Sequence, residues 1–174
     1  MIVFDLLLDF RARESYGGPM PSWKEFERAA PELAAKVRGY LDAHTHKTLA
    51  TIRRDGSPRI SGTETQQVED ELWIGSMPEA LKARDLQRDP RYALHSGSDD
   101  PPGWKGDAKV AGRAEEVTDP ETVARINHNA PPGPSHLFRL DIEEASIVRM
   151  NEAGDAIVIT SWTPARGLRE IERT

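Results

Sequence analysis

The chain has 174 residues and no cysteine, and its 23 lysines and arginines against 29 aspartates and glutamates give a net charge of −6. This length is typical of one domain with its own apolar core. The acidic balance argues against a nucleic-acid binder, which is usually basic. The lack of cysteine excludes a disulfide framework, a thiolate metal site and a cysteine nucleophile, and it is compatible with a reducing cytoplasm.

The N-terminal segment is apolar but is interrupted by Asp5 and Asp9. It lacks a basic region and is too short to span a bilayer, so we predict neither a signal peptide nor a membrane anchor. One helical face would carry Val3, Leu6, Leu7 and Phe10. This face predicts a short helix packed on the body or on a partner subunit. Since Met20 is an alternative natural start, we interpret residues 1–20 as an extension and 21–174 as a single domain.

Residues 22–43 are predicted to form one or two amphipathic helices. Ser22 and Glu25 have the spacing of a capping box. Apolar side chains then recur at helical spacing, at Leu33, Val37, Tyr40 and Leu41. Such a periodic stripe is typical of a helix that packs on a core.

The middle of the chain changes to the two-residue period of strands. Strands are predicted over 47–53 and 59–65, joined by a turn at 54–58 in which Gly56 permits positive φ. A strand over 71–75, a helix over 77–88 and a strand over 91–96 follow. A loop is predicted over 97–106 from its proline and glycine content.

The last third is mostly β. We predict a strand over 107–117, and a short helix that Asp119 begins and the proline-rich segment 130–134 ends. Strands follow over 137–142, 145–150 and 156–161, and a Pro/Gly-broken tail begins at Trp162. These short strands, with few inserted helices, predict an antiparallel barrel with helical decorations, not a doubly wound sheet. The chain contains no G-x-G-x-x-G or P-loop motif.

The first two turns of the predicted 77–88 helix carry Lys82 and Arg84, which oppose the helix dipole. A bound phosphate would explain them, because it attracts cations and free backbone amides together. The alternative is that Ser76 caps this helix, with Glu79 at capping-box spacing, and that Lys82 is solvated.

Arg59 and Ser61 are two residues apart in a strand and therefore share one face. If that face neighbours the helix start, they join Ser76 and Lys82 in a cluster suited to one dianion. The arginine would supply a planar fork, the lysine a point charge and the serines hydroxyl groups.

Four segments, taken in order, resemble the pyridoxamine 5′-phosphate oxidase-like family. They are Leu-Ala-Thr-Ile-Arg-Arg-Asp-Gly-Ser-Pro-Arg-Ile-Ser (49–61), Leu-Trp-Ile-Gly-Ser (72–76), the stretch 82–94 from Lys82 to Leu94, and Gly-Asp-Ala-Lys-Val-Ala-Gly-Arg-Ala-Glu-Glu-Val (106–117). The resemblance implies a split β-barrel that forms a homodimer. It also implies a cofactor at the subunit interface, FMN or, in some branches, the deazaflavin coenzyme.

The resemblance also implies which residues contact that cofactor. Arg59, Ile60 and Ser61 would lie along the ribityl phosphate and ring, Ile74, Gly75 and Ser76 would approach through their backbone, and Lys82 would hold the phosphate. Gly75 would let a planar ring come close because it lacks Cβ.

Two departures from the family pattern restrict the prediction. Ala80 and Leu81 stand where family members often carry a Ser-Arg pair, which thins the phosphate ligand set. The C-terminal substrate motif of the true oxidases is absent and only loosely echoed by Trp162, Arg166 and Arg169. We therefore do not predict oxidation of pyridoxine phosphate.

The histidines give no catalytic or metal site. His44 and His46 have metal-ligand spacing, but histidine near a helix C-terminus is favourable in itself, and no third ligand is near. His95 is expected to face the dimer interface, and His128 and His136 are expected to be solvated. No general base is predicted.

Two functional hypotheses follow. The first is an oxidoreductase in which a flavin or deazaflavin passes hydride to or from a small substrate. The second is a non-catalytic carrier of flavin, haem or a related tetrapyrrole on the same barrel, because fold alone does not decide function.

Overall fold

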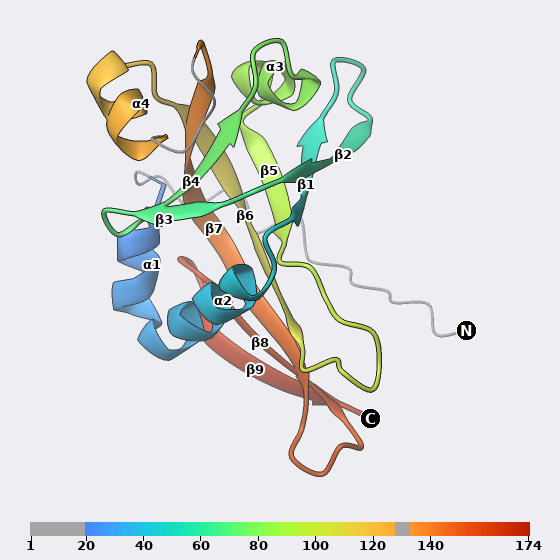
Figure 1. The fold of residues 1–174 in the computed structure, drawn as a ribbon. Coiled ribbons are helices and arrows are strands. Elements are labelled where there is room, and N and C mark those ends of the chain that lie inside the picture. The colour runs from blue at the N-terminus through green and yellow to red at the C-terminus, as the bar shows by residue number, and fades with distance from the viewer. Residues whose placement is uncertain (1–19, 128–132) are drawn as a thin grey trace.

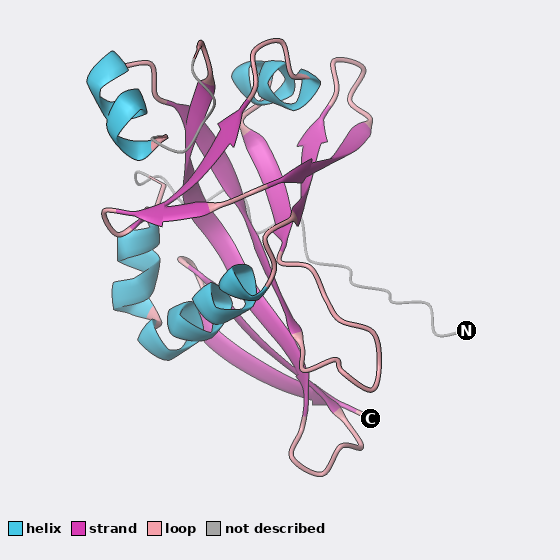
Figure 2. Cartoon of the chain, viewed as in Figure 1, coloured by secondary structure: helices cyan, strands magenta, loops and turns pink. Residues whose placement is uncertain are grey.

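The structure is a computed structural model that describes residues 20–127 and 133–174. In this part of the chain one antiparallel sheet of nine strands is surrounded by four helices (Figures 1 and 2). The strands are β1 (Lys47–Ile52), β2 (Pro58–Thr63), β3 (Gln66–Val68), β4 (Glu71–Ser76), β5 (Arg91–His95), β6 (Asp107–Glu116), β7 (His136–Met150), β8 (Ile157–Thr163) and β9 (Gly167–Arg173). The helices are α1 (Trp23–Ala29), α2 (Pro31–Ala43), α3 (Leu81–Arg88) and α4 (Pro120–Ile126).

The sheet curls into a barrel. Its strand order is β2-β1-β5-β6-β7-β4-β3, and the two ends of that order are consecutive segments of the chain. β2 pairs with β1 and β3 pairs with β4, so the barrel is split only where Glu64 and Thr65 connect them. β8 and β9 continue the sheet beyond the lower half of β7. The predicted antiparallel split barrel is confirmed.

Two strands, β4 and β8, pair with the same edge of β7, and a gap separates them. β4 pairs with residues 136–139 and β8 pairs with residues 145–150. The backbone of Pro21 enters this gap, where its carbonyl accepts a hydrogen bond of 2.7 Å from the amide of Ile142. The segment before α1 therefore supplies a backbone partner that the sheet lacks.

β7 is one strand where two were predicted. The register with β6 shifts between Ala111 and Gly112, so that Glu143 is the extra residue of a bulge. A Cβ on Gly112 would lie 1.9 Å from the carbonyl oxygen of Asp141. Only glycine fits this close approach of two backbones.

α1 and α2 close one mouth of the barrel. They are the two helices into which the predicted helical region 22–43 divides. The capping box at the start of α1 is complete, because the Ser22 side chain and the Glu25 side chain each receive the other residue's backbone amide. Trp23 and Phe26 are fully buried, and the Phe26 ring lies 4.9 Å from that of Trp162. This apolar contact fixes the helix pair on β7 and β8.

Several predicted boundaries are wrong. α3 begins at Leu81 rather than at residue 77, because Pro78 disfavours helical backbone at Met77 and Glu79 has left-handed backbone. α4 ends at Ile126, before the proline-rich segment. The short strand β3 and the final strand β9 were not predicted. The Pro/Gly signal marks only the turn at 164–166 and the first residue of β9, Gly167, which has a φ of 64°.

Some predictions lie outside the described residues. They are the helix carrying Val3, Leu6, Leu7 and Phe10, the residue His128, and most of the proline-rich segment 130–134.

Candidate functional site

The charged corner of the molecule lies where α3 crosses β1 and β2. Arg59 and Ser61 are paired in register with Thr51 and Leu49 of β1, so they share the inner face of the sheet. The Arg59 Nε donates to the Asp85 Oδ2 of α3 at 2.6 Å. The predicted shared face is confirmed, and that face turns toward α3.

Lys82 reaches the same strand from the first turn of α3. Its Nζ donates to the carbonyl oxygen of Gly62 at 2.7 Å. Burial lowers the pKa of the Lys82 ammonium, and the negative charge of Glu64 opposes part of that effect. Arg59 and Lys82 are thus both tied to the β2–α3 contact, one at each end of residues 59–62.

The start of α3 differs from that of α1. Its N-cap residue is Ala80, and among the described residues no side chain caps its first turn. Ser76 lies four residues earlier, at the end of β4, so the alternative in which it caps the helix is wrong. Glu79, its proposed capping-box partner, has left-handed backbone at φ 64° and forms an ion pair with Arg84. The helix start is therefore open to an anion.

Ser76 is buried beside a histidine. It is 8% exposed, and among the described residues its Oγ has no hydrogen-bond partner. It pairs in register with His136 of β7, whose Nδ1 lies 2.7 Å from Glu116 Oε1. Because the carboxylate can only accept, Nδ1 carries the proton in this contact. His136 is therefore not simply solvated, as was predicted, but is held by Glu116.

Ile74 and Gly75 point to opposite sides of β4. Ile74 is fully buried in the main core, so only its backbone is available to a ligand. A Cβ on Gly75 would lie 3.0 Å from Asn127 Oδ1. The lack of a side chain at Gly75 therefore makes room for Asn127, which is a different reason from the approach of a ring that the sequence suggested.

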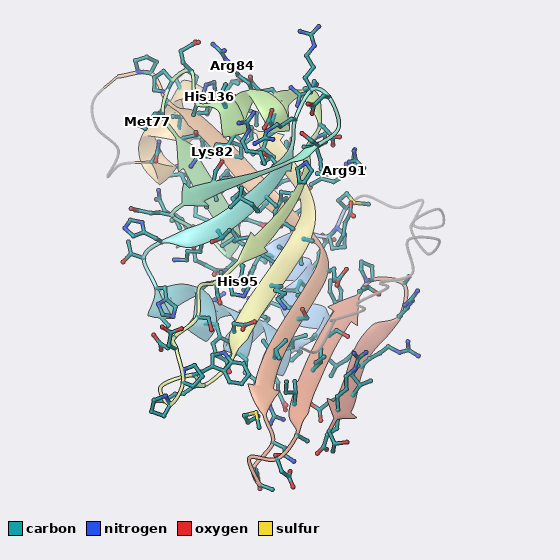
Figure 3. All side chains as sticks on the ribbon, turned by 90° about the vertical axis from the view of Figure 1, so that its right-hand side faces the viewer. Met77, Lys82, Arg84, Arg91, His95 and His136 are labelled. Carbon is teal, nitrogen blue, oxygen red and sulfur yellow. The ribbon has the colours of Figure 1, made fainter. Side chains whose placement is uncertain are left out.

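Two exposed apolar side chains border the charged corner. Met77 and Leu81, beside the start of α3, are 75% and 54% exposed. Ile60 is 67% exposed but lies on the outer face of β2, opposite to Arg59 and Ser61. Figure 3 shows Met77, Lys82, Arg84 and His136 at the same end of the molecule. This end combines cations with exposed apolar groups, as an amphipathic ligand with a phosphate requires.

Sequence reasoning missed the carboxylate at the centre of this corner. Asp85 is 3% exposed and accepts hydrogen bonds from Thr51, Arg59 and Arg88. Burial raises its pKa, but these hydrogen bonds outweigh burial, and the net pKa lies below its ordinary value. It lies three residues after Lys82 on the same helix face, but nothing in the local sequence indicates that it is buried.

His95 and His46 each lie near an acidic side chain. His95 Nε2 is 3.4 Å from Asp107 Oδ1 on the neighbouring strand, and His46 Nδ1 is 3.7 Å from Glu64 Oε1. Within residues 20–127 and 133–174, no three His, Asp or Glu side chains converge as metal ligands would. No helix in those residues is long and apolar enough to cross a membrane.

A phosphate group fits the charged corner. Among the described residues, the Nη nitrogens of Arg59 make no hydrogen bond, and Ser76 Oγ is buried without a partner. Lys82 and the uncapped first turn of α3 supply positive charge and backbone amides. A flavin phosphate would use these donors.

The fold and this corner define a split-barrel protein with a cluster of cations suited to an anion. The family described as pyridoxamine 5′-phosphate oxidase matches residues 33–149, which is more than half of the chain. The chain therefore belongs to this family, as the sequence resemblance predicted. No curated protein matches it significantly.

Solved structures share the fold at low sequence identity. A protein from Listeria innocua described as a pyridoxamine 5′-phosphate oxidase is 20% identical, with a TM-score of 0.55 over 65% of this chain and 95% of that one. A related FMN-binding protein from Nostoc punctiforme is 13% identical, with a TM-score of 0.55 over 86% and 96%. The haem storage protein HutZ from Vibrio cholerae is 19% identical, with a TM-score of 0.50 over 64% and 90%.

Proposed function

We propose that this protein is a flavin-dependent oxidoreductase that binds FMN and transfers hydride to or from a small substrate. The observation that carries the proposal is the pair of cations, Arg59 and Lys82, which α3 and β2 bring together beside an uncapped helix start. Family membership supports it, because the family implies FMN. The similar Nostoc protein is described as FMN-binding.

The residues have separate tasks in this proposal. Arg59 and Lys82 would bind the phosphate, with Ser61 and Ser76 as hydroxyl partners. The backbone of residues 74–76 and the exposed Ile60 would border the ring. The flavin would supply the redox chemistry, so the protein needs only to bind, orient and exclude water.

We propose that a second copy of the chain covers the outer face of β1, β2, β5 and β6 and completes the site. Ala50 of β1 is paired in register with Ile60 of β2 and Ala93 of β5, and Ala93 with Ala111 of β6, so these four side chains share one face. Figure 3 looks toward this side of the molecule. Small apolar residues in the middle of a sheet face suit close packing of another surface.

Light scattering tests the dimer. A dimer at micromolar concentration supports the interfacial site, and a strictly monomeric protein contradicts it.

The reducing cytoplasm suggested by the cysteine-free sequence stays a prediction.

The deazaflavin coenzyme is the alternative cofactor. Ala80 and Leu81 leave the phosphate corner with fewer polar ligands than FMN binders of the family often have. A site with fewer phosphate ligands depends more on contacts with the ring and the rest of the cofactor.

A non-catalytic carrier of flavin, haem or tetrapyrrole is the second candidate function. The similarity to a haem storage protein favours it. The absorbance spectrum of the purified protein separates these possibilities, since flavin, deazaflavin and haem absorb at different wavelengths. Reduction of a bound flavin followed by turnover with an acceptor would then distinguish an enzyme from a carrier.

Titration of the protein with FMN, followed by flavin fluorescence, tests the cofactor site. Arg59→Ala and Lys82→Ala should each weaken FMN binding roughly tenfold or more, because hydrogen bonds to charged groups contribute about 1.5–3 kcal/mol. Lys36→Ala on exposed α2 is the matched control and should change nothing. Unchanged affinity in both site variants would refute the phosphate assignment.

A further inference from the structure

The buried carboxylate of Asp85 lies between two guanidinium groups and a hydroxyl. Its Oδ2 accepts from Arg59 Nε at 2.6 Å and from Thr51 Oγ1 at 3.0 Å, and its Oδ1 accepts from Arg88 Nη2 at 3.0 Å. These partners come from β2, β1 and α3. Asp85 is 3% exposed, so these contacts shield its carboxylate from water.

The contact with Asp85 uses only one edge of the Arg59 guanidinium. Nε is occupied, whereas the two Nη nitrogens have no hydrogen-bond partner among the described residues. The Arg59 side chain keeps 19% of its surface exposed. An arginine held in this way presents its remaining donors in a fixed direction.

The same helix sets the position of the second cation. Lys82 and Asp85 are three residues apart on α3 and therefore lie on one helix face. Lys82 is bonded to Gly62, and Asp85 to Arg59, so α3 is held to both ends of residues 59–62. A phosphate placed over this stretch of β2 would meet both cations.

We propose that Asp85 is the positioning residue of the cofactor site: it orients Arg59 so that the Nη nitrogens face the phosphate of the bound flavin. This inference rests on the proposed flavin site. Binding that must first order a free arginine loses affinity, and Asp85 removes that cost before the ligand arrives. Asp85 also separates the like charges of Arg59 and Arg88, which would otherwise repel each other.

The competing explanation for the Asp85–Arg59 contact is a purely structural ion pair between α3 and the β1–β2 hairpin. The two differ in what they predict for a ligand without phosphate. A positioning role acts through the phosphate, so it affects FMN and spares riboflavin. A structural role alters the whole site and affects both ligands alike.

The experiment measures dissociation constants for FMN and for riboflavin on the full chain. Asp85→Asn should weaken FMN binding about tenfold and leave riboflavin binding within about twofold. Thr51→Val is the matched control, because it removes another bond to the same carboxylate without touching Arg59. Thr51→Val should leave the ratio of the two dissociation constants unchanged.

A double variant ties the effect to Arg59. Once Arg59→Ala is present, adding Asp85→Asn should cause no further loss of FMN affinity. Equal losses for FMN and riboflavin, unchanged or tighter FMN binding, or additive losses in the double variant would each overturn the inference while leaving the flavin site intact. If Lys82→Ala also leaves FMN binding unchanged, or the wild-type chain does not bind FMN, the proposed function fails as well.

Discussion

The starts of α1 and α3 are built in opposite ways. At α1 the chain satisfies its own backbone amides through Ser22 and Glu25, and the first turn is covered by buried Trp23 and Phe26. At α3 the cap is Ala80, the first turn carries Lys82, and the neighbouring Leu81 is exposed. One helix start is complete within the chain, and the other leaves donors and charge available to a ligand.

The largest effect on stability is expected in α1, whose start is complete within the chain. Phe26→Ala should lower the free energy of unfolding by about 3–5 kcal/mol, because a fully buried ring leaves a cavity beside Trp162. Urea denaturation measures the loss, and Lys36→Ala on the exposed face of α2 should cost less than about 0.5 kcal/mol. A loss below about 1 kcal/mol for Phe26→Ala would show that α1 adds little to the core.

Asp85→Asn should be the most destabilising change in the charged corner, at about 3 kcal/mol near neutral pH. The pKa of Asp85 is lowered in the folded protein, so its contribution is present above the unfolded carboxyl pKa of about 4 and is lost as pH falls through the lower folded value. The difference between variant and wild type should therefore shrink on acidification. A difference that stays constant down to pH 2 would contradict this linkage.

Leu81→Arg should tighten FMN binding about tenfold, because it adds a charge-assisted donor to the first turn of α3. Leu81→Gln is the control of similar size without charge and should gain little. Fluorescence titration measures both. A gain that is equal in the two variants would mean that removal of exposed apolar surface, rather than charge, is responsible.

Ser22→Ala should cost about 1 kcal/mol, since it removes the side chain that caps α1. The melting temperature would report the loss. FMN affinity should not change, because α1 lies well away from α3 (Figure 1). A change in affinity would show that the two helix starts are coupled.

Ala80→Ser should give the smallest effect, a gain of about 0.5 kcal/mol in the protein without cofactor. The backbone at Ala80 already has the extended conformation of a helix cap, so a serine there can accept a first-turn amide. Calorimetry without FMN measures the gain. No stabilisation would indicate that this end of α3 is already satisfied.

Local signals in the sequence were sufficient wherever the structure follows local chemistry. The capping box at Ser22, the turn at Gly56 and the helix start at Asp119 were all predicted and confirmed. The positions of Arg59 and Ser61 on one strand face also follow from the two-residue period. The cofactor roles assigned to these and the other site residues remain predictions.

The failures share a different cause. In β7 the residues that face the main core change from even to odd numbers, from Leu140 and Ile142 to Ala145 and Ile147. Two strands were predicted across this change of phase, whereas a bulge at Glu143 opposite Gly112 keeps one strand continuous. The signal for the bulge is a contact between β6 and β7, which no single segment displays.

Asp85 illustrates the same limit in the candidate site. In the sequence it is one charge in a polar helix, and nothing local shows that it is buried. Its partners Thr51 and Arg59 are 34 and 26 residues away. A prediction of its role needs the three-dimensional position of α3 over the hairpin.

The hydrogen bond between Pro21 and Ile142 has a consequence for the order of folding. Pro21 is synthesised long before β7, yet the gap that it fills does not exist until β4, β7 and β8 are all in place. The Pro21 carbonyl therefore stays without this partner until β7, one of the last strands of the chain, is in place. Contacts of such long sequence separation slow folding, so we expect the closure of this edge to be a late step rather than a nucleus.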